Sequence, residues 1–358
     1  MSFGTAAHFM LSLNFERFSN STVSEVILPP KKKRERSGRQ IEIGVGPDGD
    51  MQADVYRPAG ARSHGTIIVI HGMTVTGNRD PRIINLGRAL AEAGYTAVAP
   101  LIPGIQDQQI RPAVYEDVGL AIQRVSDDAD LCPSGKLGLL GPSFSGSAGL
   151  IASARPENID RVSSICTIGP YATIPSAFDF FFKAEQPDEY GKTIVLWNFV
   201  EYGIGKNKAV LRALKLATLD NGHRRKPEEC ELPAYLETMK PKDRELFERL
   251  RHDRDFRLEL WEQQIINHPA LVDMQQYIEC AGNLREGMAP VVLIHGREDD
   301  VIPPSESGLL YARLDELGVP ARLCITDLIS HGDHGLTLAM IPQSIELAQA
   351  FAAFFKHV

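Results

Sequence analysis

The feature that most limits the fold is a set of short apolar runs that alternate with segments of helical periodicity. GTIIVIHG, YTAVAPLIPG, KLGLLG, RVSSICTIG and PVVLIHG are apolar along nearly their whole length, as strands buried on both faces of a sheet are. Between these runs apolar residues recur at helical spacing, for example at Ile83, Leu86 and Leu90. Strands that alternate with helices predict an α/β fold, with a mostly parallel central sheet and helices on both faces.

This alternation divides the chain into three parts. It covers residues 41–174 and 286–358, which we take as the core, and it begins with QIEIGV and MQADVYRP around a Gly-Pro-Asp-Gly turn, a hairpin signal. Residues 175–285 lack the strand pattern and carry aromatic clusters and charged helical segments, so we expect a helical cap inserted into the core. Residues 1–40 are expected to form an N-terminal extension. Its basic run at 31–36 is interpreted as a solvated loop, with a targeting or anionic-surface role as the alternative.

Charge and composition exclude several classes of protein. The chain of 358 residues has 38 basic and 46 acidic side chains and a net charge of −8, so it lacks the basic footprint of a nucleic-acid-binding protein. No apolar run approaches the ~18 residues of a membrane span. The five cysteines are widely spaced and include no C-x-x-C pair, a pattern typical of reduced thiols in a cytoplasmic protein rather than of disulfides or zinc ligands. We expect no metal and no cofactor.

A serine follows the strand KLGLLG, in the sequence Gly141-Pro142-Ser143-Phe144-Ser145-Gly146. A sharp turn between a buried strand and a helix would expose the Ser143 hydroxyl, and it requires small residues two positions away on each side, here Gly141 and Ser145. The amino end of the helix favours developing negative charge. The alternative for Ser143 is an ordinary helix N-cap.

An oxyanion hole can be formed after an earlier strand. His71-Gly72-Met73 follows IIVI, and Gly72 would let the backbone turn away from the sheet. The amide of Met73 could then point to the same place as the amide of Phe144, and two such N–H groups stabilise an oxyanion. A plain turn between strand and loop is the alternative.

Two later strands end in acidic residues and histidines. The loop after VVLIHG contains Glu298, Asp299 and Asp300, any of which could orient a histidine. The strand ARLCITD leads to Ser330-His331-Gly332-Asp333-His334, where one histidine would act as general base for the serine. Exposed loop residues are the alternative, because no cluster elsewhere supplies the further ligands of a metal site.

These segments resemble the serine-nucleophile branch of the α/β-hydrolase superfamily over residues 41–174 and 286–358. IIVIHGM, GPSFSG, IHGREDDVIP and SHGDH carry the resemblance, and the order serine, acid, histidine agrees with it. The resemblance implies Ser143 as nucleophile, Asp299 as acid and His331, in preference to His334, as base. It also implies the amides of Met73 and Phe144 as oxyanion donors. Ser145 stands where the family usually has glycine and adds a second hydroxyl near the site.

The predicted function is hydrolysis of a small-molecule ester or thioester by a serine hydrolase, through an acyl-enzyme. The resemblance implies this chemistry, and the aromatic cap would favour an apolar group on the substrate, unless its aromatic residues only pack the helices together. Two alternatives stay open. One is acyl transfer or a lyase-type or peroxidase-like reaction in the same pocket, and the other is a non-catalytic protein that binds a small molecule on the same fold.

Overall fold

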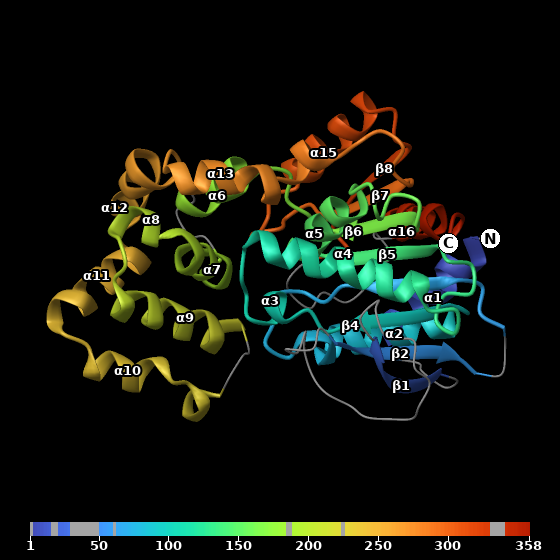
Figure 1. The fold of residues 1–358 in the computed structure, drawn as a ribbon, viewed down its shortest axis with the longest axis horizontal. Coiled ribbons are helices and arrows are strands. Elements are labelled where there is room, and N and C mark those ends of the chain that lie inside the picture. The colour runs from blue at the N-terminus through green and yellow to red at the C-terminus, as the bar shows by residue number, and fades with distance from the viewer. Residues whose placement is uncertain are drawn as a thin grey trace.

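One sheet forms the centre of the molecule. The computed structural model describes residues 3–15, 21–28, 50–59, 62–183, 188–222, 226–329 and 341–358. Within this part eight strands pair in the order β1-β2-β4-β3-β5-β6-β7-β8 (Figure 1). They are β1 (Ser21–Leu28), β2 (Met51–Pro58), β3 (Thr66–Val69), β4 (Thr96–Pro100), β5 (Leu137–Pro142), β6 (Val162–Ile168), β7 (Val291–Gly296) and β8 (Ala321–Thr326).

The strands from β4 to β8 run parallel, and only the pairs β1–β2 and β2–β4 are antiparallel. Every residue of β3, β4 and β7 is buried, which is why these strands are apolar without alternation. The predicted mostly parallel α/β sheet is confirmed.

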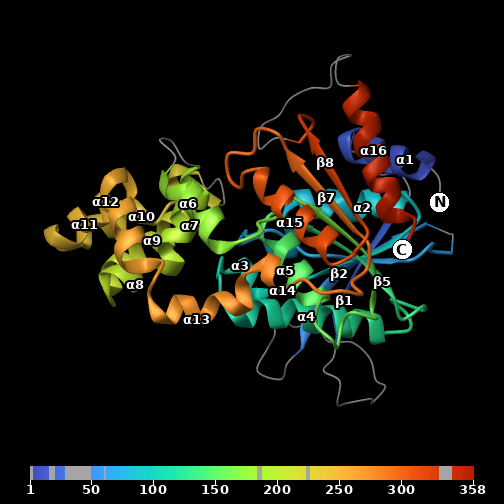
Figure 2. The same cartoon turned by 90° about the horizontal axis from the view of Figure 1, so that it is seen from above.

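Helices cover both faces of the sheet and bury two apolar layers. On one face lie α4 (Pro112–Asp127), α5 (Phe144–Ser153) and α15 (Ser305–Glu316). On the other lie α1 (Phe3–Phe15), α2 (Pro81–Glu92) and α16 (Ile341–Phe355) (Figure 2). Local sequence fixes where α2 begins, because the Asp80 side chain accepts the Arg82 N–H and Pro81 occupies the first turn. None of the described helices is long and apolar enough to cross a membrane.

The described N-terminal elements pack on the core, within the range 1–40 that the sequence predicts as an N-terminal extension. β1 pairs with β2 along its full length, from Ser21↔Pro58 to Leu28↔Met51. α1 packs against α2 and α16, and the Phe9 ring meets that of Phe351 at 4.9 Å. The apolar start of the chain therefore completes the layer over one sheet face. The basic run at 31–36 and the QIEIGV half of the expected hairpin lie outside the described residues.

The insertion between β6 and β7 contains helices and connecting loops and no strand among its described residues, as the predicted helical cap requires. It projects beyond the sheet edge at which the parallel strands end (Figure 1). Its helices are α6 (Ile174–Lys183), α7 (Glu189–Phe199), α8 (Glu201–Ile204), α9 (Lys208–Gly222), α10 (Leu232–Thr238), α11 (Pro241–His252), α12 (Arg254–Leu260), α13 (Pro269–Ile278) and α14 (Cys280–Asn283).

Aromatic residues form the centre of this cap. The rings of Phe178 and Phe199 lie 4.7 Å apart, and those of Phe182 and Trp261 stack at 5.0 Å. All four side chains are buried. These aromatic residues therefore pack helix against helix, in agreement with the simpler interpretation of the aromatic cluster in the sequence.

Candidate active site

The turn from β5 to α5 places Ser143 in a strained conformation. Ser143 has φ 53° and ψ −136°, and within the described chain Gln108 is the other non-glycine residue with positive φ. The Ser143 N–H donates to the Ile168 carbonyl of β6 at 2.6 Å, which fixes the turn to the neighbouring strand. A strained serine between a buried strand and a helix has the geometry of a nucleophile elbow.

Two glycines make this turn possible. A Cβ at Gly141 would lie 2.8 Å from the Ser145 carbonyl oxygen, and one at Gly146 would lie 2.7 Å from the Gly141 carbonyl oxygen. Both contacts are with backbone, which cannot move away as a side-chain end can. The sequence-based requirement for a small residue at 141 thus has a steric cause, and position 146 carries the same requirement.

The two serines of the turn differ in what their hydroxyls do. Ser145 is fully buried, and its hydroxyl donates to the His71 carbonyl. Ser143 is half-buried, and its hydroxyl makes no cap bond to α5. The N-cap interpretation therefore does not apply to Ser143, and Ser143 is the more exposed serine of this pair.

Two backbone amides are the predicted oxyanion donors. Phe144 N–H is at the amino end of α5 and Met73 N–H is in the loop after β3, and neither has a hydrogen-bond partner in the described part of the chain. A Cβ at Gly72 would meet no atom within 4 Å, so there is open space beside Met73. Gly72 does not have positive φ. The backbone conformation there therefore does not require glycine, contrary to the expectation from the sequence.

His71 anchors the loop that carries Met73, a role that sequence reasoning missed. Its Nε2 accepts the Ile102 N–H at 3.0 Å, so the proton of the neutral ring is on Nδ1, which donates to the Gly72 carbonyl at 2.9 Å. Burial lowers the pKa of His71 to about 4, although the bond to Gly72 acts in the opposite direction. The ring is therefore neutral near pH 7 and links the loops after β3 and β4.

The acid loop after β7 separates the three candidate carboxylates. Asp299 has a side chain only 10% exposed, while Glu298 and Asp300 are exposed. Asp299 Oδ1 accepts the N–H groups of Val301 and Ile302, both at 2.9 Å. Its Oδ2 would be 3.3 Å from a Cβ at Gly169, directly after β6. Asp299 therefore lies over the end of β6, next to the strand that carries Ser143.

Buried His295 supports this loop and is not a base for Ser143. Its Nε2–H donates to the Ile302 carbonyl at 2.8 Å, and its Nδ1 lies 2.7 Å from the Ser307 hydroxyl. The same Nε2 is 3.7 Å from Asp299 Oδ2. Its place at the end of β7 was visible in the sequence, but its role was not.

The predicted base, His331, and its alternative, His334, lie outside the described residues. The chain just before them is described: a Cβ at Gly296 would lie 2.3 Å from the Ile329 carbonyl oxygen and 3.8 Å from Asp299 Cβ. The loop after β8 thus starts against the end of β7, beside the acid. His331 follows Ile329 by two residues, within about 7 Å of extended chain.

A buried polar network joins the turn at Ser143 to the cap. Tyr171 lies between β6 and α6. Its N–H donates to the Ser147 hydroxyl, which in turn donates to the Tyr171 carbonyl, both at 2.8 Å. Its own hydroxyl donates to the Ile278 carbonyl at 2.6 Å and lies 2.7 Å from that of Tyr115. The Phe144 ring packs on both tyrosines, at 6.0 and 5.6 Å between centroids. Phe144 therefore contacts Tyr171, in the segment that enters the cap, and Tyr171 in turn bonds to Ile278 in α13, near the end of the cap.

No group of three or more histidine, cysteine or acidic side chains within the described ranges could hold a metal ion. None of the five cysteines forms a disulfide. Burial raises the pKa values of four of their thiols, at Cys132, Cys166, Cys280 and Cys324.

The comparisons find known proteins that are similar in structure but none that matches in sequence. No family model and no curated protein matches the sequence. A hyperthermophilic esterase from the archaeon Pyrobaculum calidifontis is similar with a TM-score of 0.51 and 16% identity, over 99% of this chain and 91% of that one. Esterase B from Lactobacillus rhamnosis gives 0.50 and 15%, over 99% and 92%. An acylaminoacyl peptidase gives 0.50 and 14%, over 96% of this chain and 43% of its own. The chain therefore has the α/β-hydrolase fold, with a helical cap inserted between β6 and β7.

Proposed function

We propose that the protein is a serine hydrolase that cleaves a small-molecule ester. The observation that carries this proposal is the strained Ser143, whose half-buried hydroxyl caps no helix, next to the Phe144 and Met73 amides. Strain of this kind is kept where function requires it. The esterases among the similar structures support an ester substrate.

In this mechanism the Ser143 hydroxyl attacks the acyl carbonyl while His331 removes its proton. Asp299 orients the imidazole and stabilises its charged form. The N–H groups of Met73 and Phe144 bind the oxyanion, and loss of one such donor typically costs about 2.7–4 kcal/mol in the transition state. The alcohol leaves with the proton from His331, and water then releases the acid from Ser143.

The partner of the enzyme is then a small ester with an apolar part, admitted between core and cap. A thioester is the nearest alternative substrate, since the same steps cleave it. The five cysteines form no disulfide, which supports a cytoplasmic site of action, because disulfides are rare there.

Labelling with a fluorophosphonate probe, followed by mass spectrometry of the adduct, tests the proposal. Wild type and Ser145→Ala should be labelled at Ser143, and Ser143→Ala should not be labelled although it remains folded by circular dichroism. Ser145→Ala is the matched control, since it removes a hydroxyl two residues away. Labelling that is lost in Ser145→Ala but kept in Ser143→Ala contradicts the assignment.

Two further functions remain as alternatives to hydrolysis. A wild-type protein that neither labels nor hydrolyses p-nitrophenyl acetate would be a binding protein on this fold. A protein that labels but transfers the acyl group to an added alcohol faster than to water would be an acyltransferase.

A further inference from the structure

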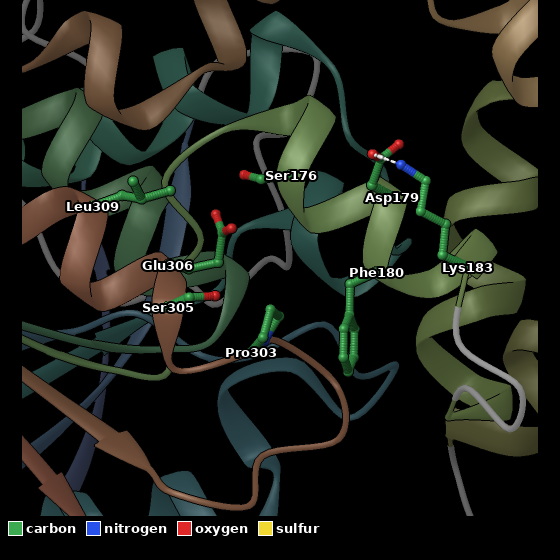
Figure 3. A pocket seen from close by; sticks show the side chains of 8 residues that line it. All are labelled: Ser176, Asp179, Phe180, Lys183, Pro303, Ser305, Glu306 and Leu309. Carbon is green, nitrogen blue, oxygen red and sulfur yellow. Dashed lines mark hydrogen bonds and ion pairs between the residues drawn. The ribbon is translucent and has the colours of Figure 1, made fainter.

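A cavity of about 460 Å³ that is widely open to solvent lies between the cap and the core, and Ser143 does not line it. Helix α6 forms its cap side, and the loop before α15 together with the first turns of α15 forms its core side (Figure 3). Pro303, in its wall, directly follows Ile302, whose N–H is bound by Asp299. The cavity therefore borders the acid loop, although Ser143, Met73 and Phe144 do not line it.

Glu306 is the most deeply buried polar residue that lines this cavity. The residue is 1% exposed, and its Oε2 accepts the N–H groups of Ala172 and Thr173 at 2.7 and 3.1 Å. Both amides lie at the amino end of α6, and Glu306 is in the first turn of α15, so two helix dipoles favour its negative charge. Its Oε1 accepts no hydrogen bond from the described residues, and in Figure 3 the carboxylate points across the cavity toward Ser176.

The charges around the cavity do not balance. Lys183 pairs with Asp179 (Figure 3), which also accepts the Trp261 indole N–H at 2.8 Å. The Lys183 ammonium therefore neutralises Asp179, whereas Glu306 forms no ion pair within the described ranges. Burial of a carboxylate is costly. The two amides offset part of this cost at Glu306, and a positively charged ligand would offset more of it.

The remaining lining selects the kind of cation. The hydroxyls of Ser176 and Ser305 can accept hydrogen bonds, and Phe180, Pro303 and Leu309 provide apolar walls. One carboxylate oxygen and two hydroxyls are fewer than the six to eight oxygen ligands that Ca²⁺ takes. An ammonium group needs only three acceptors, and an aromatic face such as that of Phe180 attracts it further.

We propose that this cavity binds a protonated primary amine carried on an apolar group, with the ammonium on Glu306. The amine has two sources of the same chemistry: a free amine, or an amino group on the substrate. The inference goes beyond the proposed hydrolysis, because binding is measured without turnover and its failure leaves the labelling of Ser143 untouched.

Isothermal titration calorimetry with benzylammonium and with neutral benzyl alcohol at pH 7.5 tests the proposal. Wild type should bind benzylammonium more tightly than benzyl alcohol. Glu306→Gln keeps an oxygen for the two amides and removes the charge, so benzylammonium should bind about tenfold more weakly while benzyl alcohol changes little. Glu316→Gln, at the other end of α15 and paired with Arg313 on the surface, is the matched control and should bind as wild type does.

A second variant keeps the proposal open to refutation if Glu306→Gln does not fold. Lys183→Met removes an exposed cation from the cavity and should tighten benzylammonium binding about two- to threefold. Equal affinity of wild type for the two probes, or unchanged benzylammonium affinity in Glu306→Gln or in Lys183→Met, overturns the proposal.

The two sources are distinguished by inhibition of p-nitrophenyl acetate hydrolysis. Competitive inhibition by benzylammonium indicates that the cavity holds an amino group of the substrate. Non-competitive inhibition or none, with binding still seen by calorimetry, indicates a free amine as separate ligand.

Discussion

The turn at Ser143 and the junction between cap and core are held by different kinds of contact. At the turn backbone meets backbone, so that a Cβ at Gly141 or Gly146 would lie within 2.8 Å of a carbonyl oxygen. At the junction single side chains hold backbone groups of distant segments. Asn198 of α7 does so with the loop between α3 (Pro103–Gln106) and α4. The comparison shows that close contacts between neighbouring backbone atoms determine the turn. Hydrogen bonds between residues far apart in the sequence determine the junction.

The largest expected effect is that of removing His331, the proposed base that takes the proton from Ser143. His331→Ala should lower kcat/KM for p-nitrophenyl acetate by about 10⁴-fold, since loss of one triad member removes most of the catalysis. His334→Ala should lower it less than tenfold. Steady-state kinetics of both variants gives the comparison, and a severe loss confined to His334→Ala would move the role of base to that residue.

Features that depend on neighbouring residues could be predicted from the sequence, whereas features that depend on distant partners could not. The positions of Ser143, Met73 and Phe144 after buried strands were predictable, because neighbours within a few residues determine them. The apolar runs predicted the core strands, because the pattern that marks a buried strand is also local. The role of His71 was missed, because its partner Ile102 is 31 residues away and no pattern links the two. Glu306 was missed likewise, since its amide partners lie more than 130 residues earlier in the chain.

The second prediction uses the pH dependence that buried His71 imposes. Its pKa falls from an ordinary 6.5 to about 4 on folding, so the unfolded chain binds the extra proton between these values and the folded protein does not. This group's contribution to the free energy of unfolding is thus fully present above pH 6.5 and decreases by up to about 3 kcal/mol as the pH falls to 4.

Urea unfolding at a series of pH values measures this effect. His71→Gln should show a shallower dependence between pH 6.5 and 4, whereas His64→Gln, at an exposed position before β3, should keep the wild-type slope. Equal slopes for wild type and His71→Gln would show that His71 does not hold the loop as a neutral ring.

The third prediction compares two helical glycines. Gly146→Ala places a Cβ 2.7 Å from the Gly141 carbonyl oxygen and should lower the free energy of unfolding by about 2 to 3 kcal/mol. Gly308→Ala in α15 meets nothing within 4 Å and should raise it by about 0.4–1 kcal/mol. Thermal unfolding of both variants tests this, and a neutral Gly146→Ala would mean that the backbone at the turn can relax.

The smallest expected effect tests the junction. Asn198 Oδ1 accepts the Ile110 N–H at 2.9 Å and its Nδ2–H donates to the Gln108 carbonyl at 2.9 Å. Asn198 is buried, so Asn198→Ala leaves two buried backbone groups unsatisfied and should cost about 1–2 kcal/mol. Because the contact joins cap to core, the loss should appear locally, as faster hydrogen exchange of the Ile110 amide and of α7.

Asn283→Ala is the control for that variant, since Asn283 bonds only to the Gln276 and Glu279 carbonyls within the cap. It should leave exchange at Ile110 unchanged. If both variants speed exchange at Ile110 equally, the cap is coupled to the core as a whole rather than through Asn198. If neither does, the loop between α3 and α4 is held by the core alone, and the contrast between turn and junction loses its strongest example.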